Sequence, residues 1–434
     1  MSRSSDRYES WGRVPHAPPA RVERAEPDRL GDGDLPVLAY GRGRSYGDVC
    51  LNRDGVILDT AGLDRVLAFD PVRGVLRAEA GATLAQILAH VVPHGWFLPV
   101  TPGTQFVTLG GAVANDVHGK NHHRVGTFGR FVTAIDLVRS TGERVALAPG
   151  DDLFRATVGG LGLTGLMTSV EIRLLKIESD RIDQATTRFE RLSDFFAISA
   201  RASARSPYAV AWLDALHPAG RGLLIEGDHA AGGDAGLAAA PPVARPALSL
   251  PFDAPEWALS PLAVRAFNAV YYRKSRGRHT TAQTHYRPFF YPLDAIGDWN
   301  RGYGRRGFFQ YQFVVPFEDG EGAVRAVLRQ LAAARAGSFL SVLKTFGELA
   351  SPGMLSFPRA GVTLALDLPN RGERTVRLLR ACDAVVREAG GAVYPAKDAC
   401  MTPESFRAFY PQWEAFAEHV DPAFSSSFWR RVTA

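Results

Sequence analysis

A dense group of polar side chains follows a glycine-rich tract in the first third of the 434-residue chain. Glycines and small residues recur through residues 102–114, and asparagine, histidine and lysine then gather in residues 115–123. A backbone without bulky side chains can approach a large flat ligand closely, and the polar groups can then contact that ligand. These residues predict a binding loop around His118, Gly119 and Lys120.

A second glycine-rich segment lies upstream, in residues 41–48. It follows a short apolar run, residues 35–40, that is typical of a strand. A strand that leads into a glycine-rich turn can offer several backbone N–H groups to a diphosphate. Two such loops in the same third of the chain predict one extended cofactor bound between them.

The basic residues are unevenly divided between five lysines and 45 arginines. Lysine can lose its proton when buried and acts as a compact point charge, which arginine does not. Lys176 stands in an ordinary apolar stretch, where we expect a solvated side chain. Lys344 and Lys397 stand in polar motifs, and we favour a functional role for both over chance placement on the surface.

Together these segments resemble the vanillyl-alcohol-oxidase or PCMH-type FAD-binding oxidoreductases and, more narrowly, the decaprenylphosphoryl-β-D-ribose 2′-oxidases. Further segments resemble the same family in the same order, namely residues 271–275, 299–304, 309–313, 344–347 and 394–398. The resemblance covers nearly the whole chain. Residues 118–123 and the pair Gln310 and Gln312 are its most specific parts.

The resemblance implies FAD as the cofactor. The residues expected to bind it are Gly41, Arg42, Gly43, Arg44, Ser45, Tyr46, Gly103, Thr104, Thr108, Gly111, Asn115, His118, Gly119, Asn121, Gly162, Gly165 and Tyr394. Some relatives link the flavin covalently to a histidine in the first loop. Arg44 holds that position here and cannot form the bond, so we expect noncovalent, dissociable FAD.

Oxidation of a secondary alcohol needs a hydride acceptor, a base for the hydroxyl proton and groups that hold the substrate. We expect Lys397 to stabilise the reduced flavin or to hold the substrate oxygen. His118 is a candidate base, with a purely structural histidine as the alternative. Tyr394 precedes Lys397 by three residues, so the two point to opposite faces in a strand but can meet if the segment turns.

The resemblance also implies a substrate pocket. Its expected residues are Gln310, Gln312, Lys344, Tyr303, Trp212, Tyr46 and Lys120. Amide and hydroxyl groups suit a hydroxyl-rich sugar, and Lys344 could meet a phosphate. Asn115, Thr363 and Ala365 depart from the family's cysteine, asparagine and cysteine, which leaves the exact sugar open.

The implied activity is oxidation of the 2′-hydroxyl of a polyprenyl-phosphate-linked pentose, such as decaprenylphosphoryl-β-D-ribose, to the 2′-keto sugar. This is the first half of an epimerisation for cell-wall arabinan synthesis, which an NAD(P)H-dependent short-chain reductase would complete. One alternative is an FAD-dependent oxidase of a soluble polyol or sugar lactone. Another is a flavin-binding protein without catalytic activity.

The expected fold class is α+β. Residues 1–176 would form a PCMH-type FAD-binding domain, 177–391 a substrate domain with an antiparallel sheet flanked by helices, and 392–434 a return to the FAD domain. A helix should begin after Thr83 and stop near Gly95, because leucine, isoleucine and valine recur on one face. Two more helices are expected at residues 321–336 and 373–389, with Cys382 on the apolar face of the second.

Three other segments require interpretation. The first 30 or so residues are polar and proline-rich, which predicts a loosely held arm. Residues 160–165 match the G-x-G-x-x-G fingerprint, but the alternating β-branched residues after them indicate a strand, so we reject a nicotinamide site there. Residues 230–261 are rich in alanine, glycine and proline, and they predict either a mobile surface loop or a lid over the substrate mouth.

Composition limits the remaining possibilities. The three cysteines have no close spacing, which argues against a disulfide framework and against a zinc or other metal site. The first residues lack the apolar core of a signal peptide, and no apolar run approaches the ~20 residues that span a bilayer. We therefore expect a soluble, cytoplasmic protein with possible peripheral contact to a membrane. A net charge of +5 suits an anionic cofactor and substrate but is too small to indicate nucleic acid.

Overall fold

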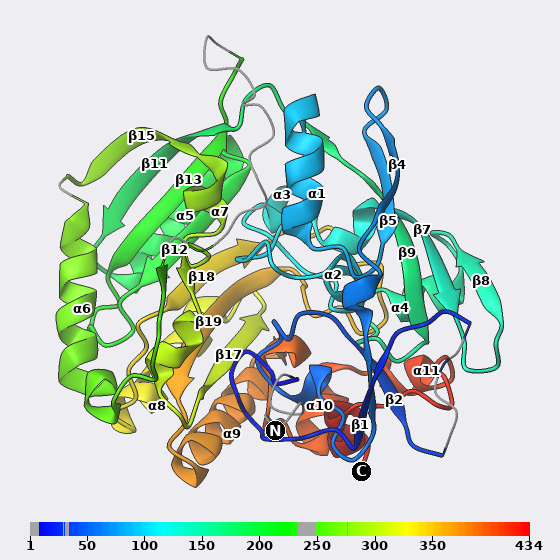
Figure 1. Ribbon diagram of the computed structural model, residues 1–434. Coiled ribbons are helices and arrows are strands. Elements are labelled where there is room, and N and C mark those ends of the chain that lie inside the picture. Colours follow the sequence, from blue (N-terminus) through cyan, green and yellow to red (C-terminus); the bar gives the residue numbers. More distant parts are fainter. Residues whose placement is uncertain (1–7, 29, 31–33, 233–245, 247, 276) are drawn as a thin grey trace.

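The computed structural model describes residues 8–28, 30, 34–232, 246, 248–275 and 277–434. Within these residues the chain forms three main β-sheets with helices between and around them (Figure 1). Mixed helices and antiparallel sheets confirm the predicted α+β class.

The first two sheets lie in the N-terminal part of the chain. The three-stranded parallel sheet has the order β1 (Arg21–Arg24), β3 (Val56–Asp59) and β2 (Val37–Tyr40). The five-stranded antiparallel sheet has the order β4 (Val66–Asp70), β5 (Val75–Glu79), β9 (Leu166–Arg173), β7 (Val132–Val138) and β8 (Arg144–Leu147).

Helix α1 (Leu84–Val91) follows β5 and begins where the sequence predicts. The Thr83 hydroxyl accepts the Gln86 N–H, and the Gln86 side chain accepts the Thr83 N–H, which completes a capping box. Its apolar face is fully buried, and the segment ends at Gly95, whose φ of 78° is left-handed. The expected helix is confirmed at both ends.

The third sheet has eight strands, all antiparallel to their neighbours. Their order is β15 (His279–His285), β11 (Arg181–Phe189), β13 (Gly222–His229), β12 (Tyr208–Leu213), β18 (Ser341–Phe346), β19 (Gly361–Pro369), β17 (Phe308–Val315) and β20 (Ala392–Val393). Alternation along β17 sends Phe309, Tyr311 and Phe313 into the main core and leaves Gln310 and Gln312 on the other face.

Helices cover the core-facing side of this sheet. α5 (Leu192–Arg205), α8 (Gly320–Ala333) and α9 (Glu373–Glu388) contribute their apolar faces to the same core cluster (Figure 1). Cys382 on α9 is fully buried in it, as predicted. The other helices are α2 (Leu109–Ala114), α3 (His122–Val125), α4 (Asp152–Thr157), α6 (Pro261–Lys274), α7 (Tyr286–Phe290), α10 (Pro403–Phe409), α11 (Trp413–Ala417) and α12 (Ser427–Thr433).

Two small sheets complete the described strands. They pair β6 (Trp96–Phe97) with β10 (Leu175–Lys176) and β14 (Leu248–Ser249) with β16 (Ile296–Gly297). The second pair includes part of residues 230–261, the predicted loop or lid, of which residues 233–245 and 247 lie outside the described residues.

The N-terminal segment is not the loosely held arm that its composition predicts. From Tyr8 onward it packs on the body of the protein: β1 pairs with β3 in parallel, and the Trp11 N–H donates to the Ser45 carbonyl at 2.8 Å. Proline-rich sequence lacks the alternation of a buried strand. The pairing of β1 with β3 is made by backbone hydrogen bonds, which cannot be predicted from amino-acid composition.

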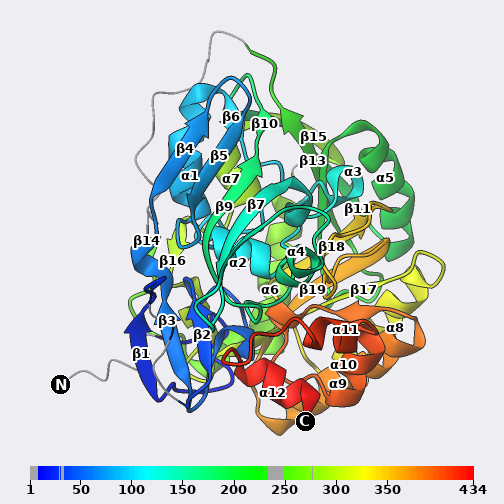
Figure 2. The ribbon, with the colours of Figure 1, turned by 90° about the vertical axis from the view of Figure 1, so that its right-hand side faces the viewer.

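The C-terminal segment lies against β2. The Val37 N–H donates to the Ala423 carbonyl, and Arg431 pairs with Asp48 at 2.7 Å. Figure 2 shows the C-terminal helices, in red, beside the blue three-stranded sheet. These contacts agree with the expected return of residues 392–434 to the FAD-binding domain. The boundaries of the three expected domains stay predictions.

Residues 160–165 form a turn that leads into β9, so the predicted strand is confirmed and no helix follows the glycines. No helix of the described residues is long and apolar enough to cross a membrane. The part of the chain that the structure describes also contains no group of three histidine, cysteine or acidic side chains placed to hold a metal ion.

Candidate active site

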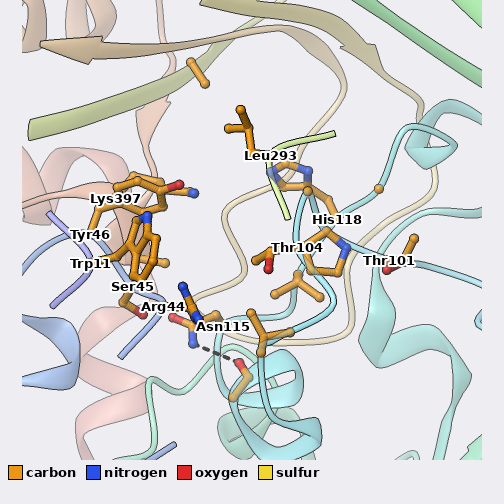
Figure 3. A pocket seen from close by; sticks show the side chains of 18 of the residues that line it. Trp11, Arg44, Ser45, Tyr46, Thr101, Thr104, Asn115, His118, Leu293 and Lys397 are labelled. Carbon is orange, nitrogen blue, oxygen red and sulfur yellow. Dashed lines mark hydrogen bonds between the residues drawn. The ribbon is translucent and has the colours of Figure 1, made fainter. Parts of the chain in front are cut away.

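A cavity of about 600 Å³ lies between the cofactor loops and the polar face of the eight-stranded sheet. Both glycine-rich loops line it, and so do residues from seven strands of that sheet. Figure 3 shows Trp11, Tyr46 and Lys397 on one side of the cavity and His118 and Thr101 on the other. The cavity therefore brings together segments from both ends of the chain.

The first loop follows β2 and carries Arg44 into the cavity. The Arg44 guanidinium stacks 3.9 Å from the Trp11 ring, and its Nε has no hydrogen-bond partner among the described residues. Burial lowers the pKa of Arg44, while the nearby Asp294 carboxylate opposes that shift. A buried cation with an unused donor is suited to an anionic or carbonyl-bearing ligand.

The second loop and the turn at residues 160–165 leave backbone open to the cavity. A Cβ added at Gly103 or Gly162 would meet no atom within 4 Å, and both residues line the cavity. Gly162 also has a φ of 76°, where a side chain is strained. Asn115 donates to the Gly111 carbonyl at 2.9 Å, yet its own buried Oδ1 has no partner. Unused polar atoms and bare backbone on one wall fit a large, flat, polar cofactor such as FAD.

His118 lies at the centre of the polar wall and is held at both ring nitrogens. Lys344 Nζ is 2.9 Å from Nδ1, and the Gln312 side-chain amide is 3.0 Å from Nε2. Burial and the charge of Lys344 lower the pKa of His118 well below its ordinary 6.5. The ring is therefore neutral at physiological pH.

The neutral ring has one proton to place. The Gln312 amide nitrogen faces Nε2, so Nε2 accepts its N–H and the ring proton lies on Nδ1, where it faces the Lys344 amine. The same amide nitrogen donates to the Thr363 hydroxyl oxygen at 3.2 Å.

Lys397 lies on the opposite wall. Its Nζ stands 3.8 Å from the centre of the Tyr46 ring and makes no hydrogen bond within the described residues. Burial lowers the pKa of Lys397 to about 7, while the Asp367 carboxylate opposes the shift. Asp367 is itself fully buried and accepts hydrogen bonds from Gln310 and from the Tyr303 hydroxyl. Lys397 is thus an amine that can titrate near neutral pH.

The segment that carries Lys397 turns, as one of the two sequence alternatives requires. After β20 it forms a short helical turn at Pro395–Lys397, and both Tyr394 and Lys397 line the cavity. The Tyr394 hydroxyl donates to the Asn115 carbonyl at 2.8 Å, and its ring stacks on Phe357. Tyr394 thereby ties the sheet to the second cofactor loop.

Four of the five lysines line this one cavity: Lys120, Lys274, Lys344 and Lys397. Burial lowers the pKa of Lys120 to about 8, and burial with repulsion from Lys120 and Lys397 lowers that of Lys344 to about 7. Lys176, the fifth, lies on the surface over Trp96. The uneven use of lysine therefore marks the site.

The structure brings most of the predicted site residues to the cavity wall. Those that line it are Gly41, Arg42, Gly43, Arg44, Ser45, Tyr46, Gly103, Thr104, Thr108, Gly111, Asn115, His118, Gly119, Lys120, Gly162, Gly165, Trp212, Gln310, Gln312, Lys344, Tyr394 and Lys397. Their roles stay predictions.

Two predicted residues do not line the cavity. The Asn121 side chain donates to the Pro99 carbonyl and holds the second loop from behind. The Tyr303 ring stacks 4.1 Å from Phe308, and its hydroxyl donates to Asp367. Both lie behind the wall, where they position residues that do face the cavity.

Sequence reasoning missed several lining residues, namely Trp11, Thr101, Tyr271, Phe289, Phe290, Leu293 and Asp294. Nothing in the sequence indicated that Trp11 lies at the site, because the residues around it predicted a loosely held N-terminal arm. Tyr271 stood in a segment quoted for the resemblance, and that was the one available clue. Asp367 was missed too, although it closes the strand whose Thr363 and Ala365 had been noted.

Comparison with known proteins agrees with the site. The family model "FAD binding domain" matches residues 30–148. Decaprenylphosphoryl-β-D-ribose oxidase of Mycolicibacterium smegmatis is 34% identical over 459 residues, which cover 99% of this chain and 98% of that protein.

Two further relatives differ in how much of the chain they match. An uncharacterised protein of Streptomyces coelicolor is 35% identical over 81% of this chain and 99% of its own length. L-gulono-1,4-lactone dehydrogenase of Mycobacterium tuberculosis is 30% identical over 37% of each chain. The full-length similarity, the FAD-binding domain and the lysine-lined cavity together place the chain in the family of FAD-binding PCMH-type oxidoreductases to which decaprenylphosphoryl-β-D-ribose oxidase belongs.

Proposed function

We propose that this FAD-dependent oxidoreductase oxidises the 2′-hydroxyl of a polyprenyl-phosphate-linked pentose, such as decaprenylphosphoryl-β-D-ribose, to the 2′-keto sugar. Similarity to the Mycolicibacterium oxidase over nearly all of both chains supports this substrate class. The cavity supplies an independent argument from charge.

The main support for the proposal is that four of the five lysines line the cavity. Among the described residues that line the cavity, Asp294 is the only acidic one, against Lys120, Lys274, Lys344 and Lys397 together with two arginines. Burial of charged amines is costly, which lowers the pKa values of Lys120, Lys344 and Lys397, and repulsion from the other two lysines adds to the shift of Lys344. An anionic ligand reverses that cost, so the cavity favours a phosphate-bearing substrate besides the cofactor's own diphosphate.

The sugar would lie against the polar face of the large sheet. Gln310 and Gln312 point into the cavity from β17, with Trp212 from β12 and Tyr46 from the first loop beside them. Amide groups can pair with sugar hydroxyls as donor and acceptor, and aromatic rings pack on the apolar faces of a pentose. Lys344 would pair with the phosphate.

FAD, when bound, supplies the acceptor for the hydride that leaves the carbinol carbon. The residues that would hold it are the bare backbone of Gly103 and Gly162, the unused Nε of Arg44 and Oδ1 of Asn115. Since Arg44 stands where some relatives carry a linking histidine, acid precipitation should release the FAD into the supernatant.

The hydroxyl proton goes to Lys397 in this proposal. Its Nζ is free of protein hydrogen bonds within the described residues, and a pKa of about 7 leaves much of the amine neutral at pH 7. His118 has both ring nitrogens engaged by Lys344 and Gln312, so it holds these two side chains in place. We therefore assign the role of general base, which the sequence alone did not decide, to Lys397.

Two electrons reach the cofactor in each turnover and must leave to an acceptor such as oxygen or a quinone. The keto sugar is then a substrate for an NAD(P)H-dependent short-chain reductase, which would return the hydroxyl with inverted configuration. Such a reductase is the pathway partner that we propose.

The regiochemistry tests the proposal. Purified holoenzyme is given polyprenylphosphoryl ribose, the product is trapped with borodeuteride, and the position of deuterium is read by mass spectrometry. Label at C2′ alone supports the proposed reaction. Label at another carbon, or oxidation of a free sugar lactone in preference to the lipid-linked sugar, contradicts it.

A further inference from the structure

Helix α6 (Pro261–Lys274) packs on the protein through a narrow polar and apolar stripe. Val264, Asn268 and Tyr272 recur every four residues and are buried. The Asn268 amide donates to Asp214 at 2.9 Å, and the Tyr272 hydroxyl donates to the Phe189 carbonyl. These contacts fix which face of α6 turns outward.

The outward face carries large apolar side chains. Leu262 and Val270, eight residues apart on one side of the helix, are 78% and 70% exposed. Trp257, in the turn before the helix, is 75% exposed, and Phe252 is 68% exposed. Figure 1 places α6 at the outer edge of the molecule. Exposed apolar residues on one side of a helix and in the turn that packs on it indicate an interaction surface.

The same face is positively charged. Arg265 and Arg273 are exposed, and α6 contains no acidic residue. Neither Arg265 nor Arg273 forms an ion pair with any described residue. Apolar side chains mixed with free arginines are typical of helices that lie in the interface of an anionic bilayer.

A continuous row of rings connects this face with the cavity. Phe267, 47% exposed, stacks on Tyr271 with ring centres 6.1 Å apart. Tyr271 in turn lies 4.8 Å from Trp212, and both Tyr271 and Trp212 line the cavity. An apolar chain could follow these rings from the outside of α6 to the site.

We propose that the outer face of α6, together with Phe252 and Trp257, docks on a lipid bilayer that contains anionic headgroups. Leu262, Val270, Phe252 and Trp257 enter the headgroup–acyl boundary, and Arg265 and Arg273 bind lipid phosphates. The cavity then opens toward the membrane along the Phe267–Tyr271 row.

Vesicle binding tests this surface without any sugar substrate, so its outcome is separate from that of the proposed reaction. The FAD-loaded protein is sedimented with vesicles of phosphatidylcholine alone and of phosphatidylcholine mixed with phosphatidylglycerol. We expect the protein to bind the anionic vesicles at least tenfold more tightly than vesicles of phosphatidylcholine alone. Each basic residue that contacts the membrane should raise the affinity roughly fivefold.

Two double variants locate the surface. Leu262→Ser/Val270→Ser and Arg265→Gln/Arg273→Gln should each weaken binding about tenfold or more. Val72→Ser, at an 86% exposed valine on the β4–β5 turn, is the matched control and should bind as the wild type does. Flavin absorbance and melting temperature should not change in any of them, because all five residues are solvent-exposed.

Failure of the wild type to bind anionic vesicles would overturn the proposal, and so would equal binding by all variants. A dimer in gel filtration that Leu262→Ser/Val270→Ser dissociates would also overturn it, because the face would then be an interface between copies of the chain.

Discussion

Lys344 Nζ lies 2.9 Å from Nδ1 of His118 and 3.3 Å from the Gly119 carbonyl oxygen. The lysine comes from β18 and the histidine from the second cofactor loop, so this contact joins the sheet to the loop. Burial and the charge of Lys344 keep His118 neutral, so the positive charge of the pair lies on Lys344, whose pKa burial lowers to about 7. That charge faces the cavity.

Lys344→Met should weaken binding of a phosphate-bearing substrate. Loss of one charge-assisted hydrogen bond costs about 1.5–3 kcal/mol, so KM for the lipid-linked sugar should rise roughly tenfold to hundredfold while bound FAD is retained. Steady-state kinetics with Lys176→Met as the control measures this, since Lys176 lies outside the cavity. An equal loss for a phosphate-free sugar would show that Lys344 does not meet the phosphate.

Flavin reduction should depend on pH through Lys397. Because burial lowers the pKa of Lys397 from 10.5 to about 7, the amine loses its proton as pH rises through 7. The rate should therefore rise across that range and level off above it, as measured by anaerobic stopped-flow. Lys397→Arg, which stays charged, should lose about 10²–10⁴-fold in rate.

Asp367→Asn refines the same experiment. The Asp367 carboxylate raises the pKa of Lys397, so its neutral replacement should move the midpoint of the pH profile to lower pH. An unshifted midpoint, or a wild-type profile that is flat between pH 6 and 8, would remove Lys397 from the role of base.

Gly103→Val should prevent FAD binding without disturbing the fold. An added side chain at Gly103 meets no protein atom within 4 Å, and it would project into the cavity wall expected to hold the cofactor. We expect a colourless protein whose circular dichroism matches that of the wild type. Gly322→Val, at an equally open glycine on α8, should stay yellow, and a yellow Gly103→Val would place FAD elsewhere.

Asp116→Ala should destabilise the second loop. The buried Asp116 carboxylate accepts the Gly129 N–H at 2.8 Å and the Ser356 hydroxyl at 2.6 Å. Both donors lose their partner in the variant, which should lower the free energy of unfolding in urea by about 1–3 kcal/mol for each buried group. Asp116→Asn keeps the shape and one acceptor, so it should lose clearly less. Equal losses would point to charge as the cause.

Local sequence patterns correctly predicted those features that depend on interactions between residues close together in the sequence or on the type of a single residue. Thr83 caps α1 as the apolar periodicity after it predicts, and the scarcity of lysine pointed to Lys344 and Lys397. Each of these follows from a period, a cap or a residue type, which the sequence displays directly.

Long-range packing accounts for the misses. Trp11 reaches the site because its N–H donates to the Ser45 carbonyl, beside the Arg44 on which its ring stacks. Tyr303 does not line the cavity. Its ring stacks on Phe308 and its hydroxyl donates to Asp367, and both contacts lie behind the cavity wall. An aromatic residue near a polar strand suits core and pocket equally well, and only the packed structure decides between them.

Anaerobic reduction of the bound flavin by a panel of sugars tests the central claim most directly. Polyprenylphosphoryl ribose, its arabinose epimer, free ribose, polyols and L-gulono-1,4-lactone are each added to the yellow holoenzyme, with Lys397→Ala beside it. We predict that the lipid-linked ribose bleaches the flavin, that the free sugars and the lactone do not, and that Lys397→Ala stays yellow. Bleaching by free polyols or the lactone, with none by the lipid-linked ribose, would contradict the account.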